Sequence, residues 1–225
     1  MTEMATKFIV SYDGTDSDRD ALALGRLLAR AGAALALAYV RHQQEPGGRE
    51  ALAEHEAEAL LEGGAGWLGD PEVPRFVVLS ASTPQGLKEL AVEEEARGIV
   101  FGSAYRTTPG HVYPQQSAER LLERGPLAIA LAPAGFGDRA DEVVASVAAV
   151  DEEGDTSAAL TAASLAAKLG AAVEKRPSPG AGLLVVGSKA PATQGTVLIS
   201  AASAYLVELS RCPTVVVPRG APLAF

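Results

Sequence analysis

The segment FGSAYRTTPGHVYPQQSAERLL (101–122) has the residue types of a loop that holds a phosphate group. It leads from an apolar run into an amphipathic helical pattern, and its glycines let a main chain come close to an anion. Unpaired N–H groups and the partial positive charge at the start of a helix would also favour phosphate. Two glutamines follow Pro114 at that start, however. The candidate ligand contacts in this segment are Gly102, Ser103, Gly110, Gln115, Gln116 and Ser117.

Two further candidates stand where other predicted strands end. Asp13 belongs to YDGT, after the apolar run 7–12, and Val40 closes the run 34–40. Ligands of open parallel sheets bind beyond the carboxyl ends of the strands, so these residues would meet the loop from Gly102 in one crevice. A purely structural alternative is that Asp13 caps the following helix and the glycines only permit tight turns. The residues alone leave both interpretations open.

The elements that would position these residues alternate between two periodicities. Short apolar runs typical of buried strands alternate with segments whose apolar residues have helical spacing. This pattern predicts an open parallel five-stranded sheet with helices on both faces, a Rossmann-like α/β fold. The polar, glycine-rich segments 63–74 and 133–141 read as connectors. The predicted strands are 7–12, 34–40, 75–80, 98–102 and 127–132, and the predicted helices are 16–32, 49–62, 84–97 and 115–124.

The remainder of the chain repeats parts of this unit. One overlay, called here the loop overlay, places Gly102-Ser103 on Gly187-Ser188, and a second overlay places Asp13 on Asp151. The offsets are 187 − 102 = 85 and 151 − 13 = 138, so the second copy lacks 138 − 85 = 53 residues between its second and fourth strands. The segment KRPSPGAG (175–182) stands in their place. We therefore expect a complete domain at 1–135 and a shortened, degenerate one at 136–225.

These stretches resemble the universal stress protein family: YDGT after the first strand, a Val at the end of the second, and GSAYRTTPGHVYP followed by SAERLL. The second copy has the same signs in VVGSKAPATQGTVLIS. The resemblance implies that ATP-binding members carry Gly, two residues, Gly, nine residues, Gly, then Ser or Thr. Only the first glycine is kept in either copy. The four positions are Gly102, Tyr105, Gln115 and Gln116 in the first copy and Gly187, Ala190, Ser200 and Ala201 in the second.

With this degenerate loop, the resemblance implies a non-enzymatic stress-response or regulatory binding module without a cofactor. The alternatives are a sensor that binds ATP or AMP in the first crevice, or a binder of another small anion there. No G-x-S-x-G elbow or suitably placed His indicates a nucleophile. Slow ATP hydrolysis stays open as part of the sensor alternative. The three histidines have no second ligand at metal-binding spacing, so no metal site is expected.

Composition and charge restrict the classes of partner that the chain could bind. The 225 residues carry a formal net charge of −9, which argues against nucleic acid and anionic membranes as partners. A single cysteine and the lack of a signal-peptide pattern predict a cytoplasmic protein. Apolar last strands at 127–132 and 214–218 would be hazardous as free edges. The resemblance implies that they pair, within one chain as a pseudo-dimer or between chains as a homo-oligomer, and a protein partner is a further expectation.

Overall fold

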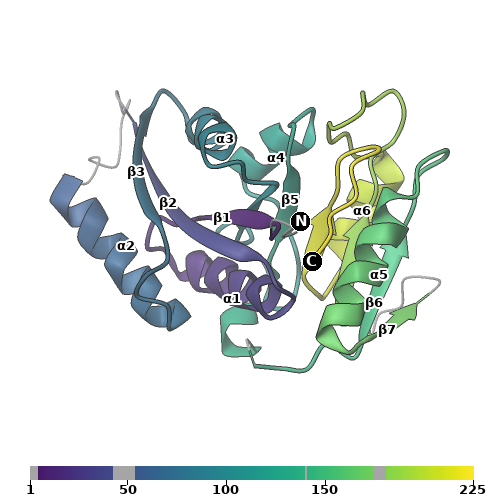
Figure 1. The fold of residues 1–225 in the computed structure, drawn as a ribbon, viewed down its shortest axis with the longest axis horizontal. Coiled ribbons are helices and arrows are strands. Elements are labelled where there is room, and N and C mark those ends of the chain that lie inside the picture. The colour runs from purple at the N-terminus through teal and green to yellow at the C-terminus, as the bar shows by residue number, and fades with distance from the viewer. Residues whose placement is uncertain (1–4, 43–53, 140, 175–180) are drawn as a thin grey trace.

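The computed structural model describes residues 5–42, 54–139, 141–174 and 181–225 (Figure 1). Its strands are β1 (Lys7–Ser11), β2 (Ala34–His42), β3 (Arg75–Ser80), β4 (Gly98–Phe101), β5 (Ala128–Leu131), β6 (Ser146–Val150), β7 (Ala172–Glu174), β8 (Leu183–Val186) and β9 (Thr214–Val216). Its helices are α1 (Asp16–Arg30), α2 (Glu54–Leu68), α3 (Thr83–Glu93), α4 (Gln116–Leu122), α5 (Ser157–Leu169) and α6 (Ala201–Leu209), with a 3-10 helix η1 (Phe136–Arg139).

All the described strands form one sheet in the order β3-β2-β1-β4-β5-β9-β8-β6-β7. The first five pair in parallel, which confirms the open parallel sheet predicted from the apolar runs. The chain leaves β1 toward β2 on one side and later returns to β4 on the other side. The loops after β1 and β4 therefore diverge at the sheet's carboxyl edge, where α/β sheets leave room for a ligand.

Helices cover both faces of this sheet, as predicted. Residues of α1, α2 and α5 pack in one apolar cluster, and residues of α3, α4 and α6 pack in a second cluster on the opposite face. Figure 1 shows α1 and α2 on the side of the sheet opposite α3 and α4. Burial on both faces explains why β4, β5 and β8 are apolar at almost every position, with no buried–exposed alternation.

The last strand of the first half, β5, pairs with the last strand of the second half, β9, within the chain. β5 and β9 are antiparallel, with Ile129 opposite Val216 and Leu131 opposite Thr214. β5 is also bonded to β4, and β9 to β8, so neither strand presents a free edge to another molecule. Of the two arrangements expected for these strands, the structure shows the intrachain one. The domain boundary at 135/136 stays a prediction.

The C-terminal segment reaches back across the sheet to the first strand. The main-chain N–H of Leu223 donates to Thr161 Oγ1 at 2.9 Å, and that of Phe225 donates to Ser164 Oγ at 2.9 Å, so α5 holds this segment. Its far end meets β1, where the rings of Phe225 and Phe8 stack with centroids 6.1 Å apart. The segment therefore ties the second half of the chain to the centre of the first.

Two predicted connectors are wrong. Helix α2 continues to Leu68, because Ala57, Leu61, Gly64 and Ala65 form one buried helical face across the glycines. A Cβ on Gly64 would lie 3.1 Å from the ring of Tyr12, so glycine there allows the helix to approach the sheet closely. The start of the predicted helix at 49 lies outside the described residues.

The second wrong connector is 133–141. It contains η1, and the side chain of Phe136 is buried in the core cluster on the α1 face. No described helix is both long and apolar enough to cross a membrane.

Candidate functional site

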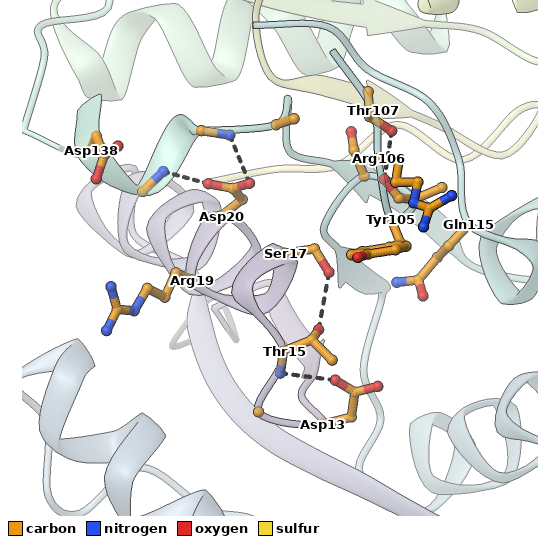
Figure 2. Close-up of a pocket in the computed structure, with 16 residues that line it drawn as sticks. Asp13, Thr15, Ser17, Arg19, Asp20, Tyr105, Arg106, Thr107, Gln115 and Asp138 are labelled. Atoms are coloured by element: carbon orange, nitrogen blue, oxygen red, sulfur yellow. Dashed lines mark hydrogen bonds between the residues drawn. The ribbon is translucent and has the colours of Figure 1, made fainter. Parts of the chain in front are cut away.

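A cavity of about 1000 Å³ opens at the carboxyl ends of β1, β4 and β5 (Figure 2). Three segments line it: residues from 13–20, in the loop after β1 and the start of α1; residues 103–107, in the loop after β4; and residues from 134–138, which run from the loop after β5 into η1. Gln115, just before α4, completes the lining. The cavity therefore lies where the diverging connections of a parallel sheet are expected to leave a crevice.

Three of the eight predicted site residues line this cavity: Asp13, Ser103 and Gln115. The other five lie outside its lining. Val40 is buried in the apolar cluster on the α3 face, and Gly102 lies against the start of α1. Gly110 forms a turn, and Gln116 and Ser117 begin α4.

Sequence reasoning missed the lining residues of the loop after β5, among them Gly135, Gly137 and Asp138. The segment was interpreted as a connector because of its polarity and glycine content. A usable signal was present, since the loop overlay continues without a gap through Gly135 and Gly220. That continuity indicates a structured loop.

Ser103 fixes the shape of the loop after β4. Its hydroxyl donates to Ala132 O at 2.7 Å and accepts the N–H of Tyr113 at 3.2 Å. The residue is only 2% exposed, so these bonds are shielded from water. The loop is therefore held by the protein itself, without any bound group.

The second half of the chain repeats these bonds at the positions that the loop overlay predicts. Ser188 Oγ donates to Val217 O at 2.7 Å and accepts the N–H of Leu198 at 3.2 Å. Gly110 and Gly195 also match, with φ of +82° and +80°. The two loops thus share these hydrogen bonds and this glycine turn, but they differ at Tyr105-Arg106, where Arg106 has a φ of +68° and the matching Ala190-Pro191 bond is cis.

Gly102 serves a packing contact. A Cβ built on it would lie 2.0 Å from the main-chain oxygen of Ser17, so only glycine allows the end of β4 to touch the first turn of α1. This contact supports a structural role for Gly102 in place of a role in ligand binding. Its position is the one glycine of the ATP-binding pattern that both copies retain.

The carboxyl group of Asp18 accepts hydrogen bonds from main-chain N–H groups just before α1. Its Oδ2 accepts the N–H of Asp13 at 2.5 Å and that of Thr15 at 3.3 Å. The residue is 4% exposed, and burial together with the nearby Asp13 carboxylate raises the pKa of Asp18 to about 8. Asp13 itself is exposed, and its Oδ1 accepts the N–H of Thr15 at 3.1 Å. Asp13 and Asp18 therefore share the capping of the main chain before α1.

Asp20 occupies the amide groups of the loop after β5. Its carboxylate accepts N–H bonds from Gly135 at 2.9 Å and from Gly137 at 2.6 Å, as Figure 2 shows. Burial raises the pKa of Asp20, and these two hydrogen bonds partly oppose the shift. The main-chain donors on this wall of the cavity are therefore already bound to a carboxylate of the same chain.

The cavity lining carries charges of both signs. Asp13, Asp20 and Asp138 provide three carboxylates against the two guanidinium groups of Arg19 and Arg106. The Arg106 guanidinium lies 5.2 Å from the centre of the Tyr105 ring.

Tyr105 forms part of the rim and is 87% exposed. Within the described part of the chain, no three His, Cys, Asp or Glu side chains gather as metal ligands do.

Neither a protein-family profile nor a curated protein sequence matches this chain. Solved structures do match it. A universal stress protein from Archaeoglobus fulgidus DSM 4304 aligns with 97% of this chain and 100% of its own, at 13% identity and a TM-score of 0.65. A functionally unknown protein from Pseudomonas aeruginosa PAO1 aligns with 96% of this chain and 93% of its own, at 13% identity and a TM-score of 0.65. The chain therefore has the universal stress protein fold.

Proposed function

We propose that this protein is a non-enzymatic regulatory binding module, built on the universal stress protein fold, whose crevice does not take ATP. One observation carries the proposal. Four main-chain amides beside the cavity, those of Asp13, Thr15, Gly135 and Gly137, already bind the carboxyl groups of Asp18 and Asp20. A phosphate could use these four amides only by displacing both side chains from part-buried hydrogen bonds.

The side chains in the phosphate-binding pattern add to this cost. Tyr105 and Gln115 both line the cavity at positions where the ATP-binding pattern has glycine. If two or three close amide contacts are lost at about 1–1.5 kcal/mol each, affinity falls roughly a hundredfold or more. The three lining carboxylates also outnumber the two lining guanidinium groups, so the charge of the lining does not favour a triphosphate.

A titration with nucleotides tests the proposal. We expect millimolar ATP, ADP or AMP, with Mg²⁺, to change the melting temperature by less than about 1 °C, because a ligand stabilises a protein only if it binds the folded form. We also expect no phosphate release from ATP above that of the buffer. A rise of several degrees with any of the three nucleotides would instead support the sensor alternative.

A restored variant is the matched control. The triple substitution Tyr105→Gly, Gln115→Gly and Gln116→Ser rebuilds the ATP-binding pattern in the first copy. ATP should raise the melting temperature of this variant more than that of the natural chain. An equal lack of response in both would mean that Asp18 and Asp20 are a sufficient obstacle by themselves.

A further inference from the structure

Arg219 stands in the second half of the chain where Ala134 stands in the first. The loop overlay relates these two positions. Their main chains are bonded alike, since Ala134 O accepts the N–H of Gly110 at 2.7 Å and Arg219 O accepts that of Gly195 at 2.8 Å. The two side chains therefore start from equivalent places in equivalent loops.

The Arg219 guanidinium ties together two loops of the second half. One of its N–H groups donates to the main-chain oxygen of Ser188 at 3.1 Å, in the loop after β8. Another donates to the main-chain oxygen of Glu153 at 2.9 Å, in the loop after β6. A guanidinium thus bridges the two loops at the carboxyl ends of these adjacent strands.

In the first half the matching loops border the open cavity. Ala134 carries only a methyl group, and it lines the cavity together with Ser103, which matches Ser188 in position and in its hydroxyl hydrogen bonds. The loops after β4 and β1, which correspond to those that Arg219 bridges, form two walls of the cavity. The first half therefore has the same setting but lacks a guanidinium of its own at this position.

The charges of the cavity suit such a group. Asp13 and Asp138 are exposed carboxylates in the lining, and Asp20 adds a third that is shared with main-chain amides. Of the two lining arginines, Arg106 lies over the ring of Tyr105 (Figure 2). A planar guanidinium can donate to carboxylates and carbonyl oxygens together, which a compact ammonium group does less well.

We propose that the first crevice binds a guanidinium group brought by another molecule, with its N–H groups donating to the Ser103 carbonyl and the aspartate lining. This rests on the proposed function, because the crevice must be free of nucleotide. The guanidinium could belong to an arginine side chain of a partner protein or to a free arginine-type metabolite.

The experiment uses the full chain and three probes, with melting temperature and calorimetric titration as readouts. N-acetyl-L-arginine N-methylamide imitates a side chain within a protein, L-arginine represents the free metabolite, and N-acetyl-L-citrulline N-methylamide has nearly the same shape without the charge. We expect one or both arginine probes to raise the melting temperature by about 3 °C or more at ten times their Kd. The tighter of the two identifies the source. Equal responses to the arginine and citrulline derivatives would overturn the proposal.

Variants locate the binding. In Ala134→Arg the chain supplies its own guanidinium, so probe affinity should fall at least tenfold without a loss of melting temperature. Ala134→Met adds similar bulk without charge and should lower the melting temperature relative to Ala134→Arg. Asp138→Asn alters only an exposed carboxylate and should weaken the arginine probes severalfold at low salt. Unchanged affinity in both Ala134→Arg and Asp138→Asn would place the probe elsewhere and overturn the proposal.

The two proposals fail in different ways. A melting-temperature rise with ATP would overturn the proposed function and, with it, this inference. No response to ATP and none to the arginine probes would overturn this inference alone. Arg219→Ala gives an independent check on the internal comparison: it should lower the melting temperature, and millimolar N-acetyl-L-arginine N-methylamide should raise the melting temperature of this variant by more than that of the natural chain.

Discussion

Replacing Asp18 with asparagine should make the protein less sensitive to rising pH. Asp18 is 4% exposed and accepts main-chain N–H bonds from Asp13 and Thr15. Burial, and then the nearby Asp13 carboxylate, raise its pKa from 3.8 to about 8. The folded protein therefore holds a proton on Asp18 at pH 7, while the unfolded chain does not.

The sign of the effect follows from this difference in bound protons. Between about pH 4 and pH 8 the folded state carries the extra proton, so the free energy of unfolding falls as pH rises. The stability that Asp18 contributes is fully present below about pH 4, and it is lost as the pH rises through the pKa of Asp18 in the folded protein, about 8. The slope is at most about 1.4 kcal/mol per pH unit. From pH 5 to pH 8 the natural chain should lose about 2–4 kcal/mol through this group.

Asparagine reproduces the protonated form of Asp18. Its amide oxygen can accept the same two N–H groups, and its NH₂ group can donate toward the Asp13 carboxylate. Because asparagine does not titrate, Asp18→Asn should show no such loss. The variant should gain stability relative to the natural chain as pH rises.

The assay is urea unfolding of both proteins at pH 5, 6, 7 and 8. Asp13→Asn is the control, because removal of the neighbouring charge should lower the pKa of Asp18 and make the pH dependence shallower. The difference between the curves of the natural chain and Asp18→Asn isolates residue 18 from other titrating groups. Parallel curves would refute the reasoning, since they would mean that Asp18 is ionised in the folded protein throughout.

Four further variants test the fold around the site. Gly102→Ala should cost about 3 kcal/mol in unfolding free energy, because the new Cβ would meet the main-chain oxygen of Ser17 at 2.0 Å. Ser103→Ala and Ser188→Ala should each cost a similar amount, about 1–3 kcal/mol, because both remove the same two hydroxyl bonds; Ser103 has in addition a longer bond to His111 O at 3.3 Å. Deletion of residues 138–225 should leave an insoluble or self-associating fragment, because it uncovers the apolar edge of β5; sedimentation of the purified fragment measures this.

The controls for these changes also come from the chain. Gly110→Ala introduces a Cβ into open space, so it should cost only about 1–2 kcal/mol for the left-handed backbone. A smaller loss in Gly102→Ala than in Gly110→Ala would show that α1 moves away easily. A twofold or greater difference between the two serine variants would argue against equivalent loops, and a soluble monomer of residues 1–137 would count against the role given to β9.

The sequence predicted which residues of the loop after β4 correspond to those of the loop after β8. The loop overlay placed Gly102-Ser103 on Gly187-Ser188 and Gly110 on Gly195, and the structure shows matching hydrogen bonds and backbone angles there. This worked because both contacts of each serine, 10 and 29 residues away, lie within the stretch over which the loop overlay runs without a gap.

The walls of the candidate site were less predictable. Asp20 lies 115 residues before Gly135, yet its carboxylate binds that residue's amide. Nothing in the local pattern of either segment indicates this contact, since the aspartate reads as part of a helix start and the glycine as part of a connector.

By itself the sequence determined the parallel five-stranded unit, because short apolar runs and helical periodicity indicate which residues are buried. Only the tertiary structure decided that β5 pairs with β9 in the same chain and that Asp18 and Asp20 occupy the amides beside the cavity. The physical reason is that periodicity records which side of an element is buried. Which distant groups share that buried space depends on how the elements pack, and there the cost of an unpaired amide or carboxylate selects the partners.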